Sequence, residues 1–381
     1  MKKLMFLLPV AALAMAACSN EESGVQTSRS NAVVVSPVIQ GATRGTVYTD
    51  ANIFPSFNLI ANGSFATEAI NSNPANQEYT MSVTKSGSSW TLGTPLYWGD
   101  ATTAASFTAY AGGNANVAPS GGNIAFTVAD SPADQTDFVV AYNRGSQTDF
   151  TAGVPLHFRH TLSQILIKAS YSTDDTYANS HPALTVKVKN VSIVNVNNAS
   201  VLTLPTASTA KGETYEAVWA APTGTQTYTS ADKVLTLGSS VVAIDNSDAV
   251  GPMLLMPQTQ SALTDWTNKT TGTYLKVVVD IDYQTAQGDE GSKVFDLYPA
   301  KAGTEAGNQT AGEGTYAEMY CPINIDWKAG YKYTYQLNFS NVGCGKKADG
   351  TDIISGVLKP VTFLVTVEEE WQDGGTQTPV L

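Results

Sequence analysis

The sequence predicts an all-β protein with two strand-rich domains, each a sandwich or barrel, and three observations support this prediction. Apolar and polar residues alternate with a period of two over many short stretches, as they do in half-buried strands. Gly, Pro, Asn and Ser separate these stretches at short intervals, which is typical of turns between the strands of a sandwich. The 381 residues are enough for two or three domains of ordinary size.

The composition excludes several classes of function. Asp and Glu outnumber Lys and Arg by 33 to 21, whereas a protein that follows nucleic-acid phosphates needs a basic face. Nucleic acid is therefore not an expected partner. With 43% hydrophobic and only 14% charged residues, the chain can bury a sizeable core and is not a disordered polyelectrolyte. Three His and three Cys leave little material for a metal site, so we expect no metal and no cofactor.

The first 17 residues have the order of an export signal. Two lysines precede an apolar stretch, Leu4–Ala14, which is too short to span a bilayer. Small residues then lead to Cys18, and this order resembles a bacterial lipoprotein signal. We therefore expect residues 1–17 to be removed by cleavage between Ala17 and Cys18, and Cys18 to carry lipid, including palmitate. The alternative is an ordinary secretory signal followed by an incidental cysteine.

Short strands follow one another through the first half of the chain. The first, Asn31–Gln40, is rich in β-branched residues, and Val33, Val35 and Ile39 fit one buried face. Gly41–Gly45 interrupts this strand. The same criteria predict further strands at Val47–Leu59, Tyr79–Thr84, Trp90–Leu92, Leu96–Trp98, Ser106–Tyr110, Asn123–Val128 and Asp137–Ala141.

The second half repeats this style after a less regular middle. His157–Lys168 is the segment most compatible with a helix, although its end is strand-like. Leu184–Val196 alternates in two runs with a one-residue shift between them. Residues 206–232 are rich in Thr, Ala, Ser and Gly and form the expected joint between domains at 45–205 and 206–381. Later strands are predicted at Lys233–Leu237, Val241–Ile244, Met253–Met256, Tyr274–Tyr283, Ser292–Leu297, Pro322–Trp327, Tyr331–Phe339 and Val361–Val367.

Few residues suggest catalysis or metal binding. His157 and His160 lie three residues apart, but no nearby Cys or carboxylate completes a ligand set, so we expect a structural role. Asp280 and Asp282 share one face of a predicted strand. Such a pair can serve a glycosidase or bind calcium, but the simpler interpretation is the solvent face of an amphipathic strand. We therefore expect no catalytic residue.

The tryptophans and the remaining cysteines leave alternatives open. Trp90, Trp98 and Trp266 would line a glycan site if they are exposed, whereas buried tryptophans fill a sandwich core. Cys321 and Cys344 would form a disulfide in an oxidising compartment or remain as two buried thiols.

Several short motifs follow one another along the chain. They include Ala42–Gly45, Leu96–Trp98, Phe107–Tyr110, His157–Ile165, Leu254–Thr259, Trp327–Tyr333, and Val365–Val367 with Trp371. In this order, and after a lipoprotein signal, the chain resembles the fimbrillin, or type V pilin, family of Gram-negative anaerobes. His157–Ile165 is similar to the family's F-x-H-x-L-S-x-I signature, Leu254–Thr259 to its L-x-P-Q-T turn, and Trp327–Tyr333 to its W-x-x-G-x-x-Y strand start.

The resemblance implies a fold of two transthyretin-like β-sandwich domains and a route to the cell surface. Family members are exported as outer-membrane lipoproteins, and an Arg-specific protease then cuts the loop after the first strand. A strand from the next subunit fills the groove that this opens. Here Asn31–Gln40 would be the removable strand, residues 18–44 a lipidated propeptide, and Arg44–Gly45 the cleavage site. Arg29 is a second candidate, but a cut there would leave the strand in place.

The expected function is that of a structural and adhesive subunit of a cell-surface fimbrium. Its expected partners are other fimbrial subunits, joined by β-strand addition, and a host glycan or protein receptor. It is not expected to be an enzyme. A stalk and a tip position both stay open, because Val361–Val367 fits a donor strand or the last strand of its own domain. The rival hypothesis is a lipid-anchored surface protein that binds glycans or anchors a fimbrium and does not polymerise.

Overall fold

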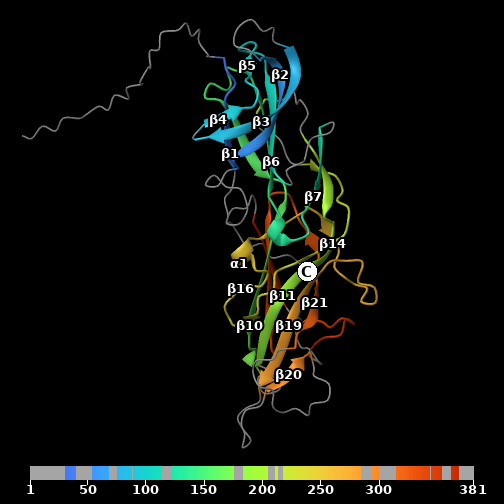
Figure 1. Cartoon of the computed structure of the whole chain (residues 1–381). Coiled ribbons are helices and arrows are strands. Elements are labelled where there is room, and N and C mark those ends of the chain that lie inside the picture. Colours follow the sequence, from blue (N-terminus) through green and yellow to red (C-terminus); the bar gives the residue numbers. More distant parts are fainter. Residues whose placement is uncertain are drawn as a thin grey trace, which may run out of the picture.

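The computed structural model is an elongated molecule built almost entirely of β-strands (Figure 1). It describes residues 31–39, 54–67, 75–87, 89–113, 122–175, 183–204, 211–212, 218–284, 294–299, 315–343, 345–353 and 362–368. Two short helical elements lie wholly within these ranges, a single turn of 3-10 helix, η1 (Pro132–Asp134), and a short helix, α1 (Ser247–Val250). No helix in the described part of the chain is long and apolar enough to cross a membrane. Ala17, Cys18, Arg44, Gly45 and Cys344 lie outside the described residues.

The N-terminal end is one large sheet wrapped around its own core. Its strands run in the order β1-β9-β8-β6-β2-β3-β4, and β5 pairs with β2. Their bounds are β1 (Val35–Ile39), β2 (Ser56–Ala66), β3 (Ala75–Ser86), β4 (Ser89–Leu92), β5 (Tyr97–Trp98), β6 (Ala105–Gly112), β8 (Phe138–Gly145) and β9 (Val154–His160). Pairing is antiparallel except between β1 and β9. Alternate side chains such as Phe57, Leu59 and Phe107 fill this N-terminal core.

The C-terminal end contains two further sheets around a second core. One has the order β16-β10-β23-β24, with β17 on β10; the other has the order β14-β11-β19-β20, with β15 on β11 and β21 on β19. Their bounds are β10 (Ser163–Ser172), β11 (Leu184–Val196), β14 (Gln226–Thr229), β15 (Leu235–Thr236), β16 (Val242–Ala243), β17 (Met253–Leu255), β19 (Tyr274–Gln284), β20 (Val294–Tyr298), β21 (Ala317–Pro322), β23 (Lys332–Ser340) and β24 (Thr362–Glu368). Buried side chains from both sheets, among them Ile167 and Val277, join one hydrophobic core. This arrangement is consistent with a β-sandwich.

Two smaller sheets complete the strand pairing of the described residues. β7 (Asn123–Thr127), β12 (Ala199–Thr203) and β13 (Val218–Trp219) form a three-stranded sheet, and β18 (Thr259–Gln260) pairs with β22 (Ile325–Asp326). Phe126 of β7 stacks on Phe138 of β8 at a centroid distance of 5.1 Å, and both belong to the C-terminal core. The second core therefore extends into strands that also belong to the first half of the chain.

The sheets divide the chain earlier than the expected boundary between residues 205 and 206. Both β10 and β11 precede this boundary, yet β10 pairs with β16, β17 and β23, and β11 pairs with β14, β15 and β19. All of these partner strands follow residue 205. We therefore propose that the division lies near Thr161, where the chain leaves β9 of the first sheet and enters β10 of the second.

The strand pattern agrees with several sequence predictions and corrects one. The predicted shift within Leu184–Val196 is confirmed as a register change between Val188 and Asn190. The helix-compatible segment 157–168 instead forms the end of β9 and the start of β10. Its polar residues Thr161 and Ser163 are buried. Their burial is tolerated because their hydroxyls donate hydrogen bonds to the Phe138 and Lys328 carbonyls. Buried polar residues hide the period of two that identifies a strand.

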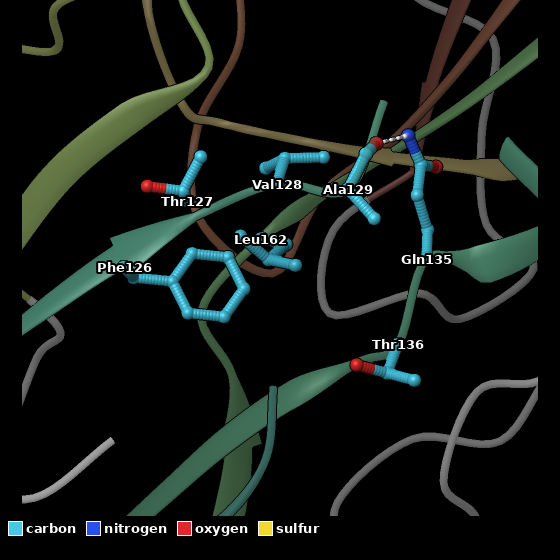
Figure 2. Close-up of a pocket in the computed structure, with 7 residues that line it drawn as sticks. All are labelled: Phe126, Thr127, Val128, Ala129, Gln135, Thr136 and Leu162. Carbon is cyan, nitrogen blue, oxygen red and sulfur yellow. Dashed lines mark hydrogen bonds between the residues drawn. The ribbon is translucent and has the colours of Figure 1, made fainter. Parts of the chain in front are cut away.

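A small cavity lies where the two halves meet. Figure 2 shows its lining, which includes Phe126, Gln135 and Leu162. Its volume is about 10 Å³, at the lower limit for holding one water molecule, so it has no room for an organic ligand. The Gln135 amide nitrogen donates a hydrogen bond to the Ala129 carbonyl, and the backbone N–H of Leu254 donates to Gln135 Oε1 at 2.7 Å. Gln135 thus ties the first half of the chain to β17 of the second.

Candidate functional site

Residues 31–39 form the candidate site, because they occupy two sheet edges at once. Near their start, the Trp98 N–H donates a hydrogen bond to the Asn31 carbonyl at 2.8 Å, and the Val33 N–H donates to the Leu96 carbonyl at 2.8 Å. This contact to β5 is antiparallel. Further along, β1 runs parallel to β9, from the pair Val35 and Val154 to the pair Ile39 and Phe158. We call residues 31–39 the first strand.

The first strand completes a closed ring of paired strands. At one end β5, which the first strand contacts, pairs with β2. At the other end β9 continues through β8 and β6 back to β2. Figure 1 shows β1, β2, β5 and β6 gathered at one end of the molecule. Removing the first strand would therefore open the ring and leave the edges of both β5 and β9 without this partner.

The side chains of the first strand alternate between core and solvent, as the sequence predicted. Val33 and Val35 are 5% and 3% exposed and belong to the N-terminal core, whereas Val34 and Val38 are 53% and 40% exposed. Ile39 was expected on the same buried face, but its side chain lies outside the described part of the structure. Full burial of a valine is worth about 1.5–3 kcal/mol, so the two buried valines hold the strand in place.

Gly153 allows the first strand to approach β9 closely, and the sequence predictions missed this role. Its φ is +101°, a backbone conformation that L side chains rarely adopt. A Cβ atom at Gly153 would lie 3.0 Å from Ser36 Oγ and 3.2 Å from the Val34 carbonyl oxygen. The same Val34 carbonyl accepts a hydrogen bond from the Val154 N–H at 2.7 Å. No strand was predicted to begin at Val154, so nothing in the local pattern marked this glycine.

A groove of about 710 Å³ lies beside the first strand, and we call it the side groove. Its lining is uncharged and mostly apolar: Ala32, Val34, Trp98, Ala101, Gln147, Thr148, Phe150, Thr151, Ala152, Gly153 and Val154. Asp149 fixes the turn that carries several of these residues, because its carboxylate accepts hydrogen bonds from the hydroxyl and N–H of Ser146. These bonds, with help from Lys211, lower the pKa of Asp149 to about 2.

The two histidines do not form a metal or acid–base pair. They lie on opposite faces of β9, where His157 is exposed and His160 is buried. His160 Nδ1 lies 2.7 Å from Asp137 Oδ2, and the Asp137 side chain is also buried. Within the described ranges, no three His, Cys, Asp or Glu side chains gather in a way that could hold a metal ion.

Asp280 and Asp282 are buried, which corrects the expectation of a solvent-facing pair. They are 3% and 8% exposed, because β19 is an inner strand with β11 on one side and β20 and β21 on the other. Lys187 of β11 forms ion pairs with both, with its Nζ 3.0 Å from Asp280 Oδ2 and 3.3 Å from Asp282 Oδ2. Although partial burial opposes its charge, hydrogen bonds and attraction to these carboxylates raise the pKa of Lys187. The pair thus forms an internal ion cluster between two strands.

The three tryptophans serve mainly in packing. Trp98 is 5% exposed and packs on Phe65 and Phe107. Trp90 and Trp266 are half-buried against other aromatic rings, with Trp266 in edge contact with Tyr320. Cys321 is buried, but Cys344 lies outside the described residues, so a disulfide between them stays a prediction.

Comparison with known proteins identifies the family. A fimbrillin-like family model matches residues 56–356, which is most of the chain. The chain belongs to the fimbrillin-like family. Its fold is similar to that of a fimbrial protein from Bacteroides vulgatus, with 15% identity, a TM-score of 0.51, and 90% of this chain and 100% of that chain covered.

Two further solved structures align with this fimbrillin-like chain at lower TM-scores. A proposed cell adhesion protein from Parabacteroides distasonis aligns with a TM-score of 0.46 at 12% identity, covering 90% of this chain and 99% of that chain. Another, from Bacteroides ovatus, aligns with a TM-score of 0.41 at 13% identity and the same coverage. A search of curated proteins finds no match.

Three of the fimbrillin-like motifs meet where the two halves of the chain join. The Ser163 hydroxyl of the motif His157–Ile165 donates a hydrogen bond to the Lys328 carbonyl of the motif Trp327–Tyr333 at 2.9 Å. Gln258 of the motif Leu254–Thr259 exchanges two backbone hydrogen bonds with Trp327, at 3.0 and 2.8 Å. The Trp327 indole in turn donates to the Tyr335 hydroxyl. These motif residues therefore stabilise the joint rather than the candidate site.

Proposed function

We propose that this chain is a structural subunit of a cell-surface fimbrium and that its first strand is removed to let subunits join. The observation that carries the proposal is the position of residues 31–39. They close the ring of the N-terminal sheet with backbone hydrogen bonds and two buried valines, yet they precede Arg44, so a cut there would separate them from the rest of the chain. Membership of the fimbrillin-like family supports the same role.

Loss of the first strand would create a binding site for another strand. The exposed edges would offer the N–H groups of Trp98 and Val154 and the carbonyl of Leu96, which the first strand now satisfies. Pockets vacated by Val33 and Val35 would select apolar side chains two residues apart. Backbone hydrogen bonds of this kind contribute about 0.5–1.5 kcal/mol each and alternate pockets set the register, which is the physics of β-strand addition.

Export and cleavage complete the proposed assembly route. Cys18 carries the lipid that anchors the precursor in the outer membrane, and a cut between Arg44 and Gly45 separates the first strand and this anchor from the rest of the chain. The partner subunit then supplies the replacing strand. In this chain β24 pairs with β23, so the segment expected as a donor already completes its own sheet. Stalk and tip positions remain alternatives for the proposed subunit.

We further propose that the chain acts without catalysis. The carboxylate pair that suggested a glycosidase is buried and ion-paired with Lys187, so neither carboxylate is placed to protonate or attack a substrate in solvent. A glycosidase activity that disappears in Asp282→Asn would contradict this conclusion.

The decisive experiment is limited proteolysis of the purified precursor with an Arg-specific protease. We expect a new N-terminus at Gly45, followed by SDS-resistant ladders on gels. Arg44→Ala should stay uncut and monomeric, whereas Arg29→Ala should behave as the unmodified chain. A chain that resists cleavage at Arg44 would contradict the proposal, and cleavage at Gly45 that yields only monomers would exclude the stalk position. Incorporation of labelled palmitate, lost in Cys18→Ser, tests the anchor separately.

A further inference from the structure

We propose that the side groove is where an incoming strand docks before the first strand has left, so that exchange proceeds by displacement rather than by prior release. The inference rests on the proposed function, because it describes how the first strand would be replaced. The occupant is an extended segment of another subunit that places an apolar side chain in the side groove.

Cutting the chain does not by itself release the first strand. A cut after Arg44 would break none of its backbone hydrogen bonds to Leu96, Trp98 and Val154, which all involve residues 31–34. Val33 and Val35 would also stay in the core. A non-covalent strand held in this way leaves slowly unless a competitor takes over its contacts one by one.

The side groove suits such a competitor, because it is lined both by the first strand and by the strand edges that the first strand now covers. Ala32 and Val34 belong to the first strand, whereas Trp98 and Val154 donate the hydrogen bonds that hold it. A side chain in the side groove would therefore touch the strand it displaces and lie next to the edge that it will occupy. The side groove is continuous with the interface that the first strand now fills.

The chemistry of the lining favours an uncharged, extended peptide. None of the lining residues carries a charge, so a charged side chain or an anionic ligand would lose hydration without gaining an ion pair. The aromatic and alkyl groups of Phe150, Ala152 and Val34 offer contacts for an apolar side chain. Gln147, Thr148 and Thr151 add neutral hydrogen-bonding groups at the same place, which suit the backbone of a strand.

The test measures how release of the first strand depends on a competing peptide. The chain from residue 18 onward receives a recognition site for a sequence-specific protease in place of residues 41–46, so that the cut does not depend on Arg44. After cleavage, a synthetic peptide with the sequence of residues 31–39 is added at increasing concentration. The free N-terminal fragment is then separated by filtration and quantified by mass spectrometry. We expect its release rate to rise in proportion to peptide concentration.

Filling the side groove should slow this displacement. Ala152 is exposed and lines the side groove. Ala152→Phe should therefore lower the slope of the release rate against peptide concentration by about tenfold. Ala133, exposed on η1 and away from the side groove, provides the matched control, and Ala133→Phe should leave the dependence unchanged. A dependence in Ala152→Phe equal to that of the control would overturn the role of the side groove.

Two other outcomes separate this inference from the proposed function. Release at a rate independent of peptide concentration would overturn docking in the side groove, while the first strand would still be removable. A fragment that stays bound at every peptide concentration would overturn both, because the strand could then not be replaced at all.

Discussion

Gly153 precedes β9 and lies against the first strand, where a side chain meets two obstacles. Its φ of +101° is unfavourable for alanine, and the Cβ would come within 3.2 Å of the Val34 carbonyl oxygen. We therefore expect Gly153→Ala to lower the free energy of unfolding by about 2–3 kcal/mol, as measured by urea denaturation. Gly87→Ala is the matched control, because Gly87 has φ +60° and no atom near its absent Cβ. Equal losses in the two variants would show that the contact with the first strand has no effect.

Tyr228 places a hydroxyl in the C-terminal core without a hydrogen-bond partner among the described residues. Burial, with a smaller contribution from Asp130, raises the pKa of this hydroxyl well above its ordinary value. Tyr228→Phe should therefore increase the free energy of unfolding by about 1 kcal/mol at neutral pH, because a buried unsatisfied group is removed.

The same tyrosine gives the protein a predictable sensitivity to alkali. Its folded pKa lies above the unfolded value of about 10, so the stability tied to the neutral hydroxyl is present below pH 10 and is lost as the pH rises further. The advantage of Tyr228→Phe over the unmodified chain should grow between pH 9 and pH 11 in urea denaturation. A constant difference over this range would mean that Tyr228 does not titrate differently in the two states.

At the level of single elements, the stability of the docked first strand should depend on its inward-facing valines and not on its outward-facing ones. Val35→Ala removes buried methyl groups worth about 1.5 kcal/mol, whereas Val34 is 53% exposed and Val34→Ala should change little. Hydrogen exchange of the Val154 amide reports on docking, because this N–H donates to the Val34 carbonyl. We expect its protection to fall about tenfold in Val35→Ala only. Equal exchange in both variants would contradict the assigned faces.

Local pattern was sufficient to predict most strands and the buried face of the first one. Alternation alone placed Val33 and Val35 inside, and the shift between Val188 and Asn190 followed from two runs out of phase. Such patterns work because successive side chains of a strand point to opposite faces. The amino acid sequence therefore contains the element and its inward face whenever only one face is apolar.

The partners of these strands could not be predicted in the same way. The parallel contact of β1 with β9 joins residues more than a hundred positions apart, and nothing local specifies it. Asp280 looked solvent-facing because alternation does not reveal that Lys187 of a neighbouring strand covers it. Gly153 was missed because its importance lies in the approach of a distant strand. The candidate site combines such long-range contacts, so only its first strand was foreseeable.

At the scale of the whole molecule, the chain itself connects the candidate site to the C-terminal core. Phe158 of β9 lies in the N-terminal core, and Leu162, four residues later, lies in the C-terminal core. Between them the Thr161 carbonyl accepts a hydrogen bond from the Trp219 indole at 2.7 Å. The edge that would receive a partner's strand therefore continues directly into β10, an inner strand of the second core. Tension applied at that edge would pass along covalent bonds into both cores.

This continuity predicts that the two cores unfold together and that Leu162 couples them. The unmodified chain should show a single calorimetric transition, because the C-terminal core includes Phe126 and Phe138 from the first half. Leu162→Ala should lower stability by about 2–5 kcal/mol and split this transition, since it removes buried contacts where the chain passes between the cores. Leu92→Ala, at a half-buried position on β4, should lower stability less and preserve one transition. If Leu162→Ala also unfolds in one step, the coupling is spread over other contacts such as the Gln135 bridge to Leu254.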